Sequence, residues 1–381
     1  MNRTGQLAIK PIKFTCPEYI GIDGTNFFNI DYSLAKLLTQ NILYSAYREP
    51  LSISEIAKLL STHRTVIEED IDFLVKNGFM LNISADNYLT NILLHDLSFE
   101  AQEKLHKIYS KVAKDICDKY VPALFDIGKE LFRSLDLIIP NNDFNFWLWS
   151  VIAFACSRKH IIPDLYQQIE KFFVSRKDGG HNLVYATVLK KHKFNFNFDL
   201  YQSYGDRDFT IGASEMYPFR IWLYNTYYSN RPDGKIASAF AGFPELYDFI
   251  NNRLENDPDK DECIERLLSN GLIVKALENN KNDYDINAIA IKMSLNDFSD
   301  LLPAMPNEFI DINHELDRHI YDLCKTQYPP QMQDLFHVFC KNTINSCGVK
   351  TRVLELLLQK GVLKPLTANQ KRTVNMLMFL D

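Results

Sequence analysis

His337, Cys340 and Cys347 are the strongest candidates for metal chemistry in this chain of 381 residues, because they follow the pattern H-x2-C-x6-C. Imidazole and thiolate groups are preferred zinc ligands, and a structural zinc site needs four of them. A fourth ligand is not evident, and the surrounding Leu-Phe-His-Val-Phe-Cys is typical of a buried helix. We therefore expect no metal here.

Local motifs for catalysis are absent from the sequence. It contains no glycine-rich phosphate loop, no nucleophile elbow of the form G-x-S-x-G and no H-E-x-x-H pair. Catalytic residues can still meet from distant positions, but nothing local indicates them. We expect a protein that is not an enzyme and that holds no cofactor.

Aromatic side chains gather in the middle of the chain, where residues 194–228 include 12 Phe, Tyr or Trp residues among 35. Such side chains can wall a pocket for a flat or sugar-like molecule. Large aromatics at strand spacing are also ordinary core residues. Both interpretations stay open for the candidate pocket residues, which are Trp147, Trp149, Tyr217, Trp222 and Tyr224.

Residues 31–95 contain the clearest succession of secondary-structure signals. A first helix can begin at Asp31, where apolar residues start to recur at helical spacing, and Pro50 ends it. Ser52 and Glu55 fit a capping box, in which each side chain accepts a hydrogen bond from the other residue's backbone N–H. The second helix is therefore short and well defined at its start, and Ala57 allows close approach of a crossing helix.

The third helix of this region ends at Gly78, the residue expected for a left-handed C-cap. Its predicted inward face consists of Val66, Ile67, Ile71, Phe73 and Leu74. Residues 79–83 and 88–94 then have the composition of two strands, with a polar turn between them. The predicted order is three helices followed by a hairpin.

The segment LSISEIAKLLSTHRTVIEEDIDFLVKNGFM resembles the helix-turn-helix core of winged-helix transcriptional regulators of the MarR and ArsR kind. The resemblance covers about 65 residues, and a weaker one over residues 19–91 points to uncharacterised sigma-factor-like regulators. It implies that the start of the third helix reads base edges and that the hairpin, or wing, touches phosphate or the minor groove. The DNA-contacting residues it implies are His63, Arg64, Thr65 and Glu68 in the helix, and Asn82, Asn87 and Tyr88 in the wing.

The charge of residues 31–95 departs from what DNA binding needs. Five Lys or Arg residues stand against eight Asp or Glu residues, a net charge of −3. Because neutralisation of phosphate dominates affinity for DNA, such a domain should bind weakly by itself. Residues 158–193 and 341–372 carry net charges of +5 and +6 and could supply attraction, or could be solvated faces or pair with acidic segments. The alternative is a winged helix that contacts protein.

The remaining sequence predicts an α+β multidomain protein. Residues 1–30 form an arm, 31–95 the winged helix, and 96–135 linker helices that either dimerise or pack on their own chain. Residues 136–240 form a central mixed, aromatic-rich domain. Residues 241–381 are mostly helical, and their repeated step from helix through glycine to strand is either a degenerate winged-helix-like unit or a common junction.

The whole chain has the composition of a soluble cytoplasmic protein. It is 46% hydrophobic and 24% charged, with a net charge of −6 that gives no global attraction to nucleic acid. Its seven scattered cysteines suit a reducing compartment. The longest apolar stretch, residues 146–156, is far shorter than the roughly 20 residues that cross a membrane.

The favoured function is transcriptional regulation through DNA, with no membrane involved. The later regions would contact a small-molecule effector, a protein of the transcription machinery or a second copy of the chain as a homodimer. The alternative function is an interaction module of the transcription machinery whose acidic winged helix does not bind DNA.

Overall fold

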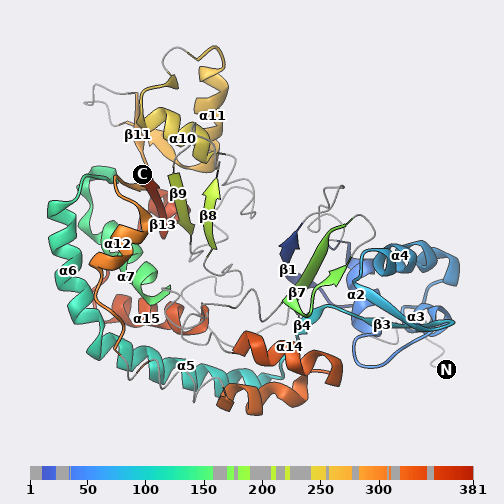
Figure 1. Cartoon of the computed structure of the whole chain (residues 1–381). Helices are drawn as coiled ribbons and strands as arrows, with labels where there is room; N and C mark the ends of the chain where they lie inside the picture. Colours follow the sequence, from blue (N-terminus) through green and yellow to red (C-terminus); the bar gives the residue numbers. More distant parts are fainter. Residues whose placement is uncertain are drawn as a thin grey trace. The chain divides into compact units, whose positions relative to one another are not determined.

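The computed structural model describes residues 11–22, 34, 36–157, 170–175, 179–188, 207–211, 219–223, 242–254, 257–276, 283–306, 309, 318–340 and 347–380. They form helices and several small β-sheets, so the protein has mixed α and β structure (Figure 1). The chain divides into two compact units. Unit 1 comprises residues 1–105, 162–194 and 314–341, and unit 2 comprises residues 106–161, 195–313 and 342–381.

Unit 1 begins its helical part with three helices and a hairpin, in the order that the sequence predicts. We call this part the N-terminal hairpin module, and α4 contacts both other helices and the first hairpin strand. Its elements are α2 (Leu37–Ser45), α3 (Ile53–Leu59), α4 (Arg64–Lys76), β2 (Met80–Ser84), β3 (Asn87–Thr90) and β4 (Leu93–His95).

Local interactions explain where these helices begin. The predicted capping box is present at the start of α3: the N–H of Glu55 donates to Ser52 Oγ at 3.2 Å, and the N–H of Ser52 donates to Glu55 Oε2 at 2.8 Å. These bonds satisfy backbone donors that have no partner within the helix. The backbone N–H and the hydroxyl of Ser52 both donate to the Glu55 carboxylate and lower its pKa.

The buried face of α4 agrees with the prediction except at Val66, which is exposed. Ile67, Ile71 and Leu74 are fully buried, whereas Val66 is 54% exposed and Phe73 is half-buried. Positions i, i+4 and i+7 share one helix face, and Val66 lies about 100° away from that face. The expected burial of Val66 was therefore wrong.

A small sheet completes unit 1. Its central strand is β7 (His181–Val188), which pairs antiparallel with β1 (Phe14–Ile22) and β6 (Val174–Ser175) and parallel with β4. Residues 318–324 are helical, and η5 (Lys325–Gln327) and α14 (Pro330–Cys340) follow. This later segment joins the hairpin module, because Gln331 Nε2 donates to the carbonyl of Tyr47 at 3.1 Å.

His95, at the end of β4, is enclosed by aromatic rings. Its Nδ1 lies 2.8 Å from the hydroxyl of Tyr328, and the rings of Tyr185 and Tyr328 meet it edge to face. Burial lowers the pKa of His95 to about 4. An unfolded histidine titrates near pH 6.5, so between these values the unfolded chain binds a proton that the folded chain excludes.

This difference makes unit 1 sensitive to acid. Because the unfolded state binds more protons below about pH 6.5, stability falls as the pH drops toward 4. Between pH 7 and pH 5, the melting temperature of His95→Gln should fall less than that of the wild type, as measured by circular dichroism. His337→Gln, at an exposed histidine of the same unit, should behave like the wild type. An unchanged acid response in His95→Gln would contradict the exclusion of this proton.

Unit 2 contains a five-stranded sheet flanked by helices (Figure 1). The central pair is parallel and the other neighbours are antiparallel. The strand order is β5 (Leu137–Ile138), β12 (Ile289–Ile291), β13 (Met376–Leu380), β9 (Phe219–Leu223) and β8 (Arg207–Ile211). The hairpin of β10 (Ile273–Lys275) and β11 (Tyr284–Ile286) forms a separate two-stranded sheet.

Two helices occupy residues 99–134, within the region predicted to be helical, and the break between them is at Tyr120. The first helix, α5 (Phe99–Lys119), ends there and α6 (Val121–Ser134) begins, with Pro122 in its first turn, where a missing N–H breaks no helical bond. The other helices of unit 2 are α7 (Phe144–Ser157), α10 (Phe243–Ile250), α11 (Lys260–Asn270), α12 (Leu295–Leu301), α15 (Cys347–Gln359) and α16 (Ala368–Thr373), with η1 (Pro140–Asn142) after β5.

The elements α10, α11, β10, β11 and β12 follow the same order as α3, α4, β2, β3 and β4, and we call them the C-terminal hairpin module. Both second helices end at a glycine with a positive φ, +77° at Gly78 and +71° at Gly271. In each, the N–H of the residue after the glycine donates to a carbonyl of the last helical turn, at 2.8 Å and 2.9 Å. These are the bonds of a Schellman cap.

An asparagine closes both hairpins in the same way. The backbone N–H of Asn91 donates to the carbonyl of the residue after the capping glycine at 2.8 Å, and its Nδ2 donates to the glycine carbonyl at 3.1 Å. Asn287 makes the same two bonds at 2.7 Å and 2.8 Å. Seven residues later a serine hydroxyl accepts from the backbone at the start of the next helix, Ser98 at 3.2 Å and Ser294 at 3.1 Å.

The strands after these asparagines also have equivalent partners. Strand β4 runs parallel to β7, and β12 runs parallel to β13. On the far side of β7 and β13 lie the antiparallel strands β1 and β9. The two units therefore share the hairpin module and the pairing order of these three strands, although β12 also pairs with β5 and few residue types coincide.

Candidate nucleic-acid interface

The first turn of α4 is an exposed part of the N-terminal hairpin module. His63 precedes the helix as its N-cap, and His63 Nδ1 lies 2.9 Å from the hydroxyl of Thr65. The side chains of His63, Arg64 and Thr65 are exposed, and Glu68 one turn later is half-exposed. The structure thus brings together the four helix residues that the resemblance implies.

Arg64 is held by two carboxylates. Its Nη2 lies 3.4 Å from Glu68 Oε1 and its Nη1 lies 3.8 Å from Asp86 Oδ2, in the turn of the hairpin. Both pairs are solvent-exposed, so each contributes little to stability. Their importance is geometric, because they bring the start of α4 close to the tip of the hairpin. Sequence reasoning did not identify Asp86, since its nearness to Arg64 depends on the angle between hairpin and helix.

The three hairpin residues that the resemblance implies have different environments. Asn82 is exposed, and Asn87 is exposed with its Nδ2 donating to Ser84 Oγ at 2.9 Å. Tyr88 is only 8% exposed, and its backbone forms a bridge with Leu51. Burial and the carboxylates of Asp86 and Asp72 raise the pKa of Tyr88. Tyr88 therefore supports the hairpin and presents little surface to a ligand.

The surface near the first turn of α4 is more acidic than basic. Glu68, Glu69, Asp70 and Asp72 lie on the same helix, and none of them is buried. Arg64 is the basic residue of the first turn, and Lys76 lies at the opposite end of the helix. A polyanion that approaches this helix thus meets carboxylates on the turn next to the exposed cation.

Apolar side chains are exposed on α4 and on the hairpin of the same module. They are Val66, on the first turn of α4, and Leu81 and Ile83, on β2. Leu81 and Ile83 both lie on β2, whose pairing with β3 shifts in register between Asn82 and Ser84. Exposed apolar side chains that lie close in the chain are more typical of protein contacts than of phosphate contacts.

The basic segment 341–372 is largely engaged within unit 2. Lys350 is buried, and Lys360 Nζ pairs with Asp118 at 2.7 Å. The guanidinium of Arg352 pairs with Glu355, and that of Arg372 donates to carbonyls at the end of α11. These cations are used in packing. Much of the other basic segment, 158–193, lies outside the described residues.

The three tryptophans are buried in the structure. Trp147 and Trp149 lie on α7, fully buried, and donate their indole N–H groups to the carbonyls of Gly128 at 2.9 Å and Lys364 at 3.0 Å. Trp222, on β9, is buried against the ring of Phe154. The indole N–H groups of Trp147 and Trp149 are thus satisfied inside the core, as buried tryptophans require. Tyr217 and Tyr224 lie outside the described residues.

Two further sequence expectations concern metal and membrane. His337 lies exposed on α14 against the ring of Tyr321, while the side chains of Cys340 and Cys347 are outside the described set. In the described part of the chain, no cluster of three or more His, Cys, Asp or Glu side chains could hold a metal ion. None of the described helices has the length and apolarity needed to cross a bilayer.

Comparison with known proteins gives no relative for this chain. No protein family model, no curated protein and no solved structure matches it.

Proposed function

We propose that this chain regulates transcription and that its N-terminal hairpin module is a winged helix that binds duplex DNA. The observation that carries the proposal is the 3.8 Å approach of Arg64, on the first turn of α4, to Asp86 at the hairpin tip. It places the start of a helix and the tip of a wing within reach of one ligand. A major groove about 12 Å wide admits such a helix, while a wing beside it can follow the backbone.

The contacts we propose come from the exposed residues. Arg64 would turn from Glu68 and Asp86 to a guanine edge or a phosphate, and His63 and Thr65 would contact the backbone or a thymine methyl. Asn82 and Asn87 would make the contacts of the wing with DNA. Because carboxylates surround Arg64, we propose that the later regions of the chain supply further attraction or respond to an effector in the cytoplasm.

Fluorescence anisotropy with the full chain tests this function. With a random-sequence duplex at about 50 mM salt, affinity should fall steeply as salt rises, since counterion release drives the binding. Arg64→Ala should weaken binding by about 1–3 kcal/mol. The pair Glu69→Gln with Asp72→Asn should strengthen it by removing repulsion from phosphate. Lys76→Ala is the matched control, because it removes the same charge at the far end of α4 and should have a smaller effect.

A second candidate function is a protein-contact module of the transcription machinery. Exposed Val66, Leu81 and Ile83 favour it, together with the acidic face of α4. Under this function, neutralising Glu69 and Asp72 would weaken the binding of a basic protein partner and would not change the affinity for DNA. Absence of DNA binding at about 50 mM salt in both the wild type and the neutralised variant would replace the first function with the second.

A further inference from the structure

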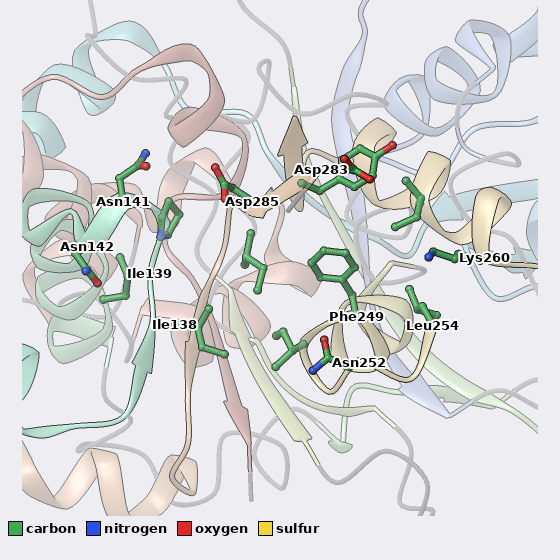
Figure 2. Close-up of a pocket in the computed structure, with 15 residues that line it drawn as sticks. Ile138, Ile139, Asn141, Asn142, Phe249, Asn252, Leu254, Lys260, Asp283 and Asp285 are labelled. Carbon is green, nitrogen blue, oxygen red and sulfur yellow. The ribbon is translucent and has the colours of Figure 1, made fainter. Parts of the chain in front are cut away.

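Unit 2 contains a pocket of about 660 Å³ beside the C-terminal hairpin module. Figure 2 shows Ile138, Ile139, Asn141 and Asn142 along one side, Phe249, Leu254 and Lys260 along the other, and Asp283 and Asp285 at one end. The volume lies within the range of ordinary ligand sites. The pocket is therefore walled by the end of β5 and η1, by α10 and α11, and by β11.

The pocket faces the edge of β11. Four consecutive residues, 283–286, line it. Side chains alternate along a strand, so one face can present only every second residue. A run of four lining residues requires that the backbone edge itself be turned toward the pocket. The opposite edge of β11 pairs with β10.

The pairing with β10 identifies the backbone groups on the pocket side. The N–H of Ala276 donates to the carbonyl of Asp283 at 3.1 Å, so Asp283 is a residue that bonds toward β10. In an antiparallel pair, residues bond alternately to one side and to the other. Tyr284 and Ile286 thus direct their N–H and C=O groups away from β10, and neither makes a backbone hydrogen bond on that side within the described part of the chain.

The N-terminal hairpin module contains a filled version of this edge. Tyr88 and Tyr284 are equivalent, because each stands three residues before the closing asparagine and opposite the fourth residue after the capping glycine. The N–H of Tyr88 donates to the carbonyl of Leu51 at 2.9 Å, and the N–H of Leu51 donates back at 3.0 Å. An extended segment therefore occupies in unit 1 the edge that borders the pocket in unit 2.

The pocket walls indicate the chemistry of an occupant. Ile138, Phe249, Ile250, Leu254 and Ile264 offer apolar surface, while Asp283 and Asp285 place two carboxylates along the strand edge. Lys260 is the cationic side chain of the lining and lies exposed on the same side of the pocket as Phe249 and Leu254 (Figure 2). A strand-like ligand with apolar side chains alternating with lysine or arginine would match the edge, the apolar walls and the charge.

We propose that this pocket binds an extended basic peptide segment of a partner protein, which adds as a strand to the edge of β11. Its backbone would exchange hydrogen bonds with Tyr284 and Ile286, as Leu51 does with Tyr88. Its apolar side chains would enter the pocket, and its cationic side chains would face Asp283 and Asp285. This inference does not depend on DNA binding by the N-terminal module.

The test uses the full chain and a fluorescein-labelled heptapeptide of alternating lysine and valine. Two further versions carry backbone N-methyl groups on all valines or on all lysines. Because alternate residues of an added strand bond to one neighbour, one methylated version should lose binding and the other should keep it. On addition of the unmodified peptide, hydrogen exchange at the amides of Tyr284 and Ile286 should slow.

Charge variants separate the pocket from general attraction. The double variant Asp283→Asn with Asp285→Asn should lower the affinity for the basic peptide by roughly 10-fold, as expected for the loss of two partly exposed ion pairs. Asp261→Asn with Glu265→Gln removes the same charge from exposed positions on α11 outside the pocket and should change affinity little. Thermal melts verify that both double variants fold.

Several results would overturn the proposal. They are no binding of the basic peptide by the wild type, equal binding of both methylated versions, or equal weakening by the two double variants. A glutamate–valine heptapeptide that binds as well as the basic one would also exclude it, because the carboxylates would then play no part in recognition.

Discussion

Replacing Gly78 with alanine should destabilise unit 1 by about 2–4 kcal/mol, the sum of a left-handed backbone strain and an overpacked contact. The φ of Gly78 is +77°, a conformation that L side chains rarely adopt. A Cβ at this position would lie 2.4 Å from Cγ1 of Val174, on a strand whose position is set by β7. Neither the cap nor the strand can move without loss of pairing.

Gly179→Ala is the matched control. Gly179 lies in the same unit with a φ of +86°, but an added Cβ would meet no atom within 4 Å. Gly179→Ala should therefore lower the free energy of unfolding only by the cost of the left-handed backbone, about 1 kcal/mol. Denaturant unfolding of the full chain, followed by hydrogen exchange in residues 36–95, measures both. Equal losses would mean that the contact with Val174 relaxes freely.

Replacing Asn287 with alanine should destabilise unit 2 by about 2–4 kcal/mol, because it leaves two carbonyls without their donor. Asn287 is 3% exposed, and its Nδ2 donates to the carbonyls of Gly271 at 2.8 Å and Asn369 at 2.9 Å. The side chain thus joins the helix cap, the hairpin and the segment before β13. An alanine would also leave a void in a close-packed position.

The equivalent change in unit 1 gives the comparison. Asn91 is half-buried, and its Nδ2 donates to the carbonyl of Gly78 alone, at 3.1 Å. Asn91→Ala should therefore destabilise its unit by about 1 kcal/mol. Hydrogen exchange in residues 271–291 and 78–95 reports the two modules separately. A loss in Asn287→Ala no larger than in Asn91→Ala would show that the bond to Asn369 adds nothing.

These asparagines bear on both proposals. The same two bonds fix the hairpin in each module, so the modules can be compared residue by residue. The comparison equates Tyr88 with Tyr284 and shows that the edge covered by Leu51 in one module borders a pocket in the other. A module that presents a helix start in unit 1 thus presents a strand edge in unit 2.

The sequence by itself determined much of the local structure of residues 36–95. The capping box of Ser52 and Glu55, the left-handed Gly78 and the following hairpin lie where their residue types predict them. Each depends on backbone groups only a few residues apart, so the preference of a short segment is decisive. The same holds for Gly271, whose step from helix to strand is visible in the sequence.

Only the tertiary structure decided which segments meet. Each unit is built from three separated stretches, whereas the sequence suggested consecutive domains. Val66 is exposed because it lies about 100° from the buried face of α4, and Trp147 and Trp149 are buried where distant carbonyls accept their N–H groups. Arg64 meets Asp86, and β11 borders a pocket, through angles between elements. Such contacts join residues far apart in the chain, and no local preference encodes the packing that brings them together.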